Sequence, residues 1–299
     1  MTDEPKQNAT IGFSREILTL FDDYVHGHIS RRGFLETGAL YAGSVAAATS
    51  LLAALSPDFA HAQKVKPDDE RITTSRVSIL ALEGCGLIEA YVAMPATQAK
   101  AAPVVLVIHE NRGLNPHIED IARRFALDGF IAVAPDALTK LGGYPGEEDK
   151  ARTLFQQLDQ ARIREDFIAA AAYAQALPQG NGRLGAVGFC YGGGMVNFLA
   201  TRMPGLRAGV AFYGAPAPIE DVPAIKAELL IHMAGNDARI NAMWPPYEAA
   251  LKAAGTHYKA FTYDGVEHGF NNDTTPRFNQ AAAELAWRRT LALFRRTLT

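Results

Sequence analysis

The sequence predicts an α/β protein whose central sheet is mostly parallel and carries helices on both faces. Two runs of alternating apolar residues flank a Gly-Cys-Gly turn at residues 84–86 and predict an antiparallel hairpin. A continuous apolar run at residues 103–109 is typical of a parallel strand buried on both faces. From there to the C-terminus, strand-like and helix-like segments alternate, which is the pattern of repeated βα units.

Each element can be placed in order along the chain. The hairpin covers residues 76–92, and a helix begins with Asn115 as its N-cap and Pro116 at its first position. The remaining elements are a strand at 130–135, helix in two pieces within 147–177, a strand at 184–189, a helix at 191–202, strands at 206–213 and 229–234, a helix at 244–254, a strand at 258–263 and a helix from 276. We see no internal repeat and expect one domain over residues 76–299.

The N-terminal segment, residues 1–62, has a different character. Residues 30–35 read Ser-Arg-Arg-Gly-Phe-Leu, and a charge-free, Ala-rich stretch follows at 37–55. It ends near an Ala-His-Ala pattern at 60–62, of the kind that signal peptidase cuts. The segment resembles a twin-arginine signal, which implies the twin-arginine export machinery as a partner and the periplasm as the location. A weak membrane anchor, or a buried Ala-rich helix in a cytoplasmic protein, is the alternative. Residues 63–75 are polar and contain a proline, so we expect a linker.

The composition narrows the class of partner. The 29 basic and 32 acidic residues nearly balance, so no electrostatic argument favours a nucleic-acid partner. Two cysteines are too few for a disulfide scaffold. We expect no nucleic-acid partner, and we expect the mature protein to be a monomer.

The clearest chemical motif is Gly-Phe-Cys-Tyr-Gly at residues 188–192, between a predicted strand and a predicted helix. This is the G-x-S-x-G nucleophile elbow with Cys190 in place of serine. Glycines leave room for the strained turn, and the helix N-terminus favours a thiolate. The alternatives are a small buried cysteine and a Cys85–Cys190 disulfide. The motif does not predict a phosphate-binding loop, because this sequence lacks the lysine that such a loop requires.

A nucleophilic thiol needs a base, and the base needs an orienting acid. In hydrolases with this elbow, the chain order is nucleophile, acid, histidine. Asp237 follows the strand at 229–234 and His268 follows the strand at 258–263, so both belong to the sheet edge where open α/β sheets bind ligands. We expect Asp237 and His268 to complete the set, although a turn aspartate and a loop histidine are the alternatives.

Two backbone N–H groups are candidates for an oxyanion hole. Tyr191 follows the nucleophile, and Asn111 follows the strand that ends near His109. Among the other histidines, His232 is expected in the core, and His117 and His257 at the surface. No H-E-x-x-H or paired Cys/His spacing is present, so no metal site is predicted.

These motifs resemble the dienelactone hydrolase (carboxymethylenebutenolidase) family of α/β-hydrolases. The resemblance rests on Gly-Phe-Cys-Tyr-Gly-Gly-Gly, the Asp237 turn, Glu-His-Gly-Phe at 267–270 and Glu110, and it covers roughly residues 76–299. It implies hydrolysis of a lactone or ester without a cofactor, through a Cys-His-Asp triad and a covalent acyl-thioester. It also implies that Glu110 contacts the resting thiol. A carboxylate there would raise the pKa of Cys190 and keep the thiol neutral, unless Glu110 only caps backbone N–H groups or pairs with Arg112.

The substrate is less well defined by the sequence. The family's arginines for a substrate carboxylate have no clear match, and Arg112, Arg152 and Arg239 are the candidates. Glu110 also lies in His-Glu-Asn-Arg-Gly rather than in the family's Glu-Ile-Phe-Gly. A general carboxylesterase or thioesterase on the same triad is the alternative enzyme, and a catalytically silent binding protein is the alternative from another class.

Overall fold

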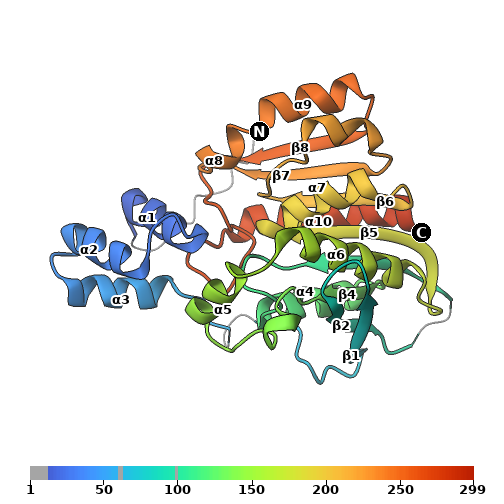
Figure 1. Ribbon diagram of the computed structural model, residues 1–299, viewed down its shortest axis with the longest axis horizontal. Helices are drawn as coiled ribbons and strands as arrows, with labels where there is room; N and C mark the ends of the chain where they lie inside the picture. The colour runs from blue at the N-terminus through green and yellow to red at the C-terminus, as the bar shows by residue number, and fades with distance from the viewer. Residues whose placement is uncertain (1–12, 60–62, 98–99) are drawn as a thin grey trace, which may run out of the picture.

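The computed structural model describes residues 13–59, 63–97 and 100–299. Its centre is an eight-stranded sheet in the order β1-β2-β4-β3-β5-β6-β7-β8. The β1–β2 and β2–β4 pairs are antiparallel, and every other neighbouring pair is parallel. The predicted class is confirmed: a mostly parallel sheet, entered through a hairpin, with helices around it (Figure 1).

The bounds of the elements follow the predicted alternation. The strands are β1 Ile72–Ala81, β2 Gly86–Pro95, β3 Ala102–Ile108, β4 Ile131–Pro135, β5 Gly180–Phe189, β6 Leu206–Phe212, β7 Glu228–Ala234 and β8 Tyr258–Tyr263. The helices are α1 Arg15–His26, α2 Arg31–Ala42, α3 Val45–Leu55, α4 Pro116–Leu127, α5 Glu148–Phe155, α6 Gln160–Gln175, α7 Tyr191–Arg202, α8 Ala238–Asn241, α9 Trp244–Ala253 and α10 Gln280–Leu298, with short 3-10 turns at Thr139–Leu141 and Ile219–Ala224.

Each face of the sheet buries its own apolar cluster. Helices α6, α7 and α9 pack on one face, where residues such as Phe167 and Leu199 are fully buried. Helices α4 and α10 pack on the other, around Phe125 and Phe294. Strand β3 contributes to both clusters because its side chains alternate between the faces. The parallel strands therefore end together at one edge, where the loops gather the polar residues.

Three local expectations are corrected by the structure. Strand β1 begins at Ile72, so residues 72–75 belong to the sheet and not to the linker expected over 63–75. Helix α10 begins at Gln280 rather than at residue 276, because the side chain of Asn279 caps its first turn. His117, expected at the surface, is 3% exposed and lies 3.2 Å from Asp273.

The N-terminal helices α1, α2 and α3 form a small unit beside the sheet edge (Figure 1). Their apolar faces bury a third cluster that includes Phe21, Phe34 and Leu52. Serine caps begin all three helices, and Gly27 ends α1 in the left-handed conformation with φ 80°. Within the described ranges no single helix is both long and apolar enough to cross a bilayer, and α2 with α3 meets that criterion only as a pair bent by 108°.

This unit is attached to the domain of the central sheet by polar contacts. The amide of Asn111 donates to the carbonyl of Val25 over 3.0 Å, and Arg277 lies 3.3 Å from Asp22. Tyr24 and Arg31 both bind the carboxylate of Asp149. The N-terminal helices therefore cover the loops at the carboxyl ends of the strands. The expected Ala-His-Ala cleavage pattern at residues 60–62 lies outside the described residues.

Candidate active site

Cys190 lies between β5 and α7 in a backbone conformation that side chains rarely adopt, with φ 54° and ψ −111°. Such strain persists only where the surrounding structure enforces it, and it often marks a functional residue. The neighbouring glycines explain how the turn fits. A Cβ on Gly188 would lie 2.0 Å from the carbonyl oxygen of Gly192, and one on Gly192 would lie 2.3 Å from that of Ile108. The motif therefore forms the predicted elbow.

His268 and Asp237 meet beside this elbow. Nδ1 of His268 donates to Oδ2 of Asp237 over 2.5 Å, and both residues are buried. Asp237 is held in place because its other oxygen caps α8, accepting from the N–H of Ile240 over 3.1 Å. The bond leaves Nε2 of His268 without a hydrogen-bond partner among the described side chains. This nitrogen is therefore available to exchange a proton with a reacting group.

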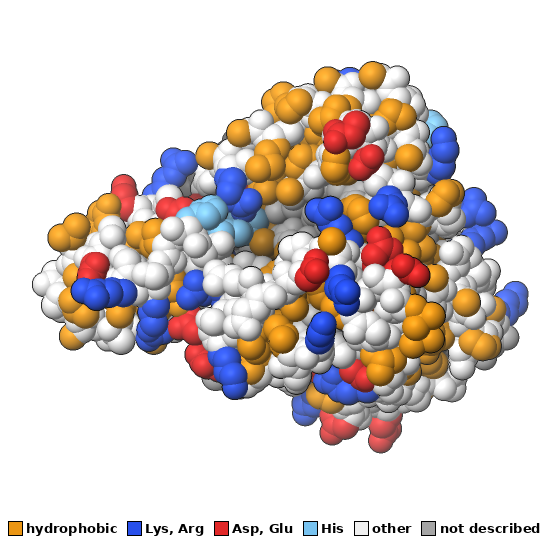
Figure 2. Space-filling view, in the orientation of Figure 1, with side chains coloured by type: hydrophobic (Ala, Val, Ile, Leu, Met, Phe, Trp, Pro, Cys, Tyr) orange, Lys and Arg blue, Asp and Glu red, His pale blue; other side chains and the backbone are white. Residues whose placement is uncertain are grey.

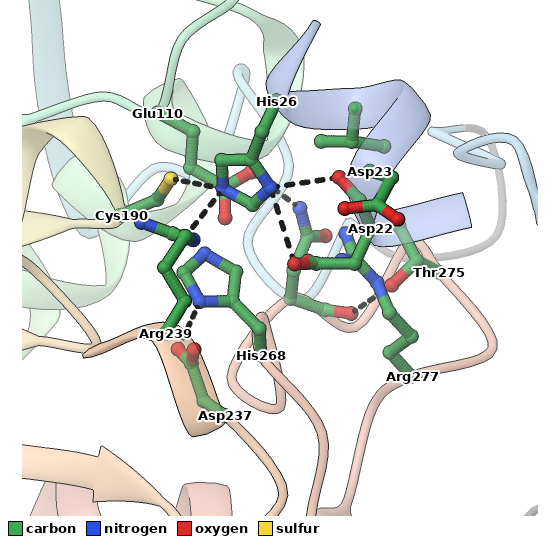
Figure 3. Close-up of polar contacts among 12 residues, drawn as sticks. Asp22, Asp23, His26, Glu110, Cys190, Asp237, Arg239, His268, Thr275 and Arg277 are labelled. Atoms are coloured by element: carbon green, nitrogen blue, oxygen red, sulfur yellow. Dashed lines mark hydrogen bonds and ion pairs between the residues drawn. The ribbon is translucent and has the colours of Figure 1, made fainter. Parts of the chain in front are cut away.

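A third titratable residue enters the site from the N-terminal helices. His26, the last residue of α1, places its Nε2 3.5 Å from Sγ of Cys190. Its ring centroid lies 4.7 Å from that of His268, and Nη2 of Arg239 lies 3.0 Å from its Nε2. Figure 3 shows the two imidazoles and the sulfur facing one another. The Cys190 thiol thus has a histidine on each side.

The two imidazoles change the charge state of the thiol. Burial raises the pKa of Cys190, but the charges of His268 and His26 and the hydrogen bond of His26 outweigh it and lower that pKa to about 6. Burial lowers the pKa of His268, but the Cys190 charge and the Asp237 hydrogen bond raise it to about 10. Burial also lowers the pKa of His26, but the charge of Cys190 and the hydrogen bond to Asp22 outweigh it and raise that pKa to about 9. At neutral pH the structure therefore favours a thiolate beside imidazolium groups.

The lowered pKa of Cys190 differs from the neutral resting thiol that was expected from Glu110. Glu110 lies in a small pocket with Cys190 and His268, and its carboxylate accepts a hydrogen bond from the amide of Asn272 over 3.0 Å. The effect of the two flanking histidines on the thiol is opposite in sign to that expected from Glu110. His26, which the sequence did not reveal, is one of the two residues that act in this opposite direction.

The main cavity beside Cys190 has a volume of about 350 Å³. Tyr191 and Asn111, the two expected oxyanion donors, both line it, and the N–H of Tyr191 belongs to the first turn of α7, where no helical acceptor exists. The rest of its wall is mostly apolar, with Met195, Phe198 and Ile240 among its residues. Figure 2 shows a hollow between the N-terminal helices and the rest of the molecule, with histidine side chains at its edge.

The three candidate arginines lie in different places. Arg239 lines the main cavity together with Arg164, which the sequence had not indicated. Arg112 is buried, donates to the side chain of Asn111 over 2.7 Å and lies 3.4 Å from Glu148. Arg152 stacks 4.3 Å from the ring centre of Tyr24. Arg112 therefore binds Asn111 and Glu148, and Arg152 packs on Tyr24 of α1. Arg239 is the candidate that lines the cavity.

The other cysteine and histidines occupy positions away from the cavity. Cys85 is a free thiol in the hairpin turn, so the alternative of a Cys85–Cys190 disulfide is wrong. His232 is fully buried in β7, as expected, and hydrogen-bonds to the Tyr263 hydroxyl over 3.0 Å. Sequence reasoning missed His26 and Asp22, because their segment was interpreted only as an export signal.

Comparison with known proteins identifies the family. Residues 88–298 match the dienelactone hydrolase family model, and residues 5–44 match a separate family described as YqhI-like. A protein from Synechocystis sp. named as a carboxymethylenebutenolidase is 34% identical, over 71% of this chain and 92% of its own. The hydrolase fragment YghX of Escherichia coli is 46% identical, over 38% of this chain and 96% of its own. A crystal structure named as a dienelactone hydrolase from Klebsiella pneumoniae superposes with a TM-score of 0.67 at 29% identity, covering 75% of this chain and 98% of that one. The chain therefore belongs to the dienelactone hydrolase family and is a hydrolase that acts on esters or lactones.

Proposed function

We propose that this hydrolase cleaves its ester or lactone through covalent catalysis at Cys190. The Cys190 thiolate attacks the carbonyl carbon, and the N–H groups of Tyr191 and Asn111 bind the oxygen that becomes negative. His268 gives its Nε2 proton to the departing alkoxide, which leaves an acyl-thioester. His268 then takes a proton from water, whose oxygen attacks the acyl carbon and releases the acid and the thiolate.

The observation that carries this proposal is the strained Cys190 beside a histidine that a buried aspartate orients over 2.5 Å. A silent binding protein would need neither the positive φ of Cys190 nor the buried pairing of Asp237 with His268. The arrangement of nucleophile, base and orienting acid supports an enzyme.

For the substrate, we propose a small ester or lactone that carries a carboxylate. Arg239 and Arg164 supply positive charge to a cavity that is otherwise mostly apolar. Guanidinium groups bind carboxylates with two parallel hydrogen bonds, so they favour an acidic acyl or alcohol portion over a neutral one. A carboxylesterase or thioesterase with a neutral substrate is the alternative.

A panel of a dienelactone, neutral p-nitrophenyl esters and an acyl thioester tests both proposals with the full chain. Cys190→Ala should remove turnover by at least about 10³-fold, and Cys85→Ala is the matched control that should keep it. Full turnover by Cys190→Ala would refute covalent catalysis there. Arg239→Gln should raise KM for the acidic substrate and leave KM for a neutral ester nearly unchanged. An equal effect on both would refute carboxylate binding by Arg239.

We also propose that the chain is exported in a folded state through its arginine pair. The support is the Ser-Arg-Arg-Gly-Phe-Leu motif at residues 30–35 and the Ala-rich stretch behind it. Replacing Arg31 and Arg32 by lysine should retain the protein in the cytoplasm, as measured by fractionation. The mass of the exported protein then tells whether the N-terminal helices remain attached. Unchanged export of the double variant would refute the proposal.

A further inference from the structure

Three side chains with metal-binding atoms meet at the contact between the N-terminal helices and the elbow. One ligand atom each of His26, Cys190 and His268 lies within 4.8 Å of the other two, and Nε2 of His26 is 3.5 Å from Sγ of Cys190. They come from α1, the elbow and the loop after β8 (Figure 3). No local spacing in the sequence links them, so the usual metal-binding motifs do not describe this group.

Both imidazoles are oriented as metal-bound histidines are. His268 uses Nδ1 to contact Asp237 over 2.5 Å, and His26 uses Nδ1 to contact the carbonyl of Asp22 over 2.8 Å, with the carboxylate of Asp22 at 3.3 Å. Such contacts fix the ring and leave Nε2 as the donor to a metal. His268 is 5% exposed, and its buried Nε2 has no hydrogen-bond partner among the described side chains and faces the same space as the thiol (Figure 3).

We propose that His26, Cys190 and His268 form a binding site for a thiophilic divalent cation, with Zn²⁺ as the fitting ion. Tetrahedral zinc with bonds of about 2.3 Å to sulfur and about 2.05 Å to nitrogen separates the two ligand atoms by about 3.5 Å. The Sγ to Nε2 distance of His26 has this value. One thiolate and two neutral imidazoles are a common zinc ligand set, with the fourth position left to water. The protons that the three groups carry leave to solvent when the ion binds.

Arg239 opposes the ion because its guanidinium contacts one of the three ligands directly. Its Nη2 lies 3.0 Å from Nε2 of His26, so a cation there must displace the guanidinium toward the main cavity, which Arg239 lines. The carboxylates of Asp22 and Asp237 behind the two histidines offset the charge of the ion. Removing the positive charge at position 239 should therefore tighten metal binding.

The consequence for the enzyme is reversible inhibition. A thiolate bound to zinc cannot attack a carbonyl, and the ion joins α1 to the elbow. This inference shares Cys190 and His268 with the proposed triad, but it concerns binding and does not require turnover.

The test is metal binding to the full chain after treatment with a chelator. Titration with Co²⁺ alone should show one equivalent bound, with a thiolate-to-cobalt charge-transfer band and the visible absorption of a tetrahedral ion. Competition with Zn²⁺ should remove both signals. His26→Ala should weaken Zn²⁺ binding by at least about 10- to 100-fold. Cys190→Ser should abolish the charge-transfer band, and Arg239→Gln should increase the affinity.

His28→Ala is the matched control, because His28 is exposed and lies beside His26 in the same segment. Its affinity should equal that of the wild type. His26→Gln provides a second variant with a side chain of similar reach, and circular dichroism shows whether each variant is folded. Equal Zn²⁺ affinity of folded His26→Ala and wild type would overturn the three-residue site. So would an unchanged charge-transfer band in Cys190→Ser. These readouts succeed or fail whether or not the chain hydrolyses the tested esters.

Discussion

His26 and Cys190 are separated by 164 positions in the chain, yet Nε2 of one lies 3.5 Å from Sγ of the other. The contact makes the N-terminal helices part of the surroundings of the Cys190 thiol. A segment that resembles an export signal by its arginine pair also supplies a charge beside the proposed nucleophile. A chain cleaved near residue 62 would lack this histidine.

The first prediction concerns the charge state of Cys190. Because its pKa is lowered to about 6, alkylation by iodoacetamide should accelerate as pH rises through about 6, where the thiolate forms. His26→Ala removes one positive charge and one hydrogen bond from the thiolate, so the midpoint should move up by roughly one pH unit. Mass spectrometry of Cys190 alkylation against pH measures it. The His28→Ala control should keep the wild-type midpoint, and the same midpoint in His26→Ala would contradict the role of His26.

The second prediction concerns Asp237. Asp237→Asn keeps an oxygen to cap α8 but loses the charge that orients and stabilises the His268 imidazolium. Turnover should fall on the order of 10²- to 10⁴-fold with little change in melting temperature. Steady-state kinetics and thermal unfolding measure the two effects. Wild-type activity in this variant would mean that another carboxylate, Glu267 or Asp264, orients the histidine.

The third prediction compares two glycines of α7. A Cβ on Gly192 would lie 2.3 Å from the backbone oxygen of Ile108, whereas one on Gly194 meets its nearest atom at 3.6 Å. Gly192→Ala should therefore lower the free energy of unfolding on the order of 3 kcal/mol or more. Gly194→Ala should raise it by about 0.5–1 kcal/mol through helix propensity. Denaturant unfolding of both variants measures this, and similar stabilities would show that the elbow relaxes around a side chain.

The fourth prediction concerns stability in acid. Burial raises the pKa of Asp273, but His117, Arg124 and Lys64 outweigh it and hold that pKa well below its ordinary value. A lowered folded-state pKa stabilises the protein above the unfolded value of about 4, and this stabilisation is lost as pH falls below it. Asp273→Asn should therefore lower the melting temperature most at pH 6 and by less at pH 3, because the stabilisation is lost completely only as pH falls further, through the lowered folded-state pKa. An equal decrease at both pH values would show that the charge of Asp273 does not contribute.

Much of the fold and of the site was predictable because it depends on short stretches of sequence. The apolar run at residues 103–109 predicts a buried central strand, and Asn115 with Pro116 predicts the start of α4, which the structure confirms. The Gly-Phe-Cys-Tyr-Gly motif predicts the elbow. Asp237 and His268 follow from the rule that parallel strands end at one sheet edge, and they meet there.

Contacts between distant segments were decided by the tertiary structure alone. His26 lies on an amphipathic helix whose sequence does not say which surface it covers, so its position beside Cys190 could not be predicted. His117 was expected at the surface but is buried. Its Nδ1 lies 3.2 Å from Oδ1 of Asp273, a residue that is distant in the sequence. Local patterns determine where strands, helices and turns form, since their interactions span a few residues. The charge of the thiol depends on which side chains the packing of separate helices brings within a few ångströms.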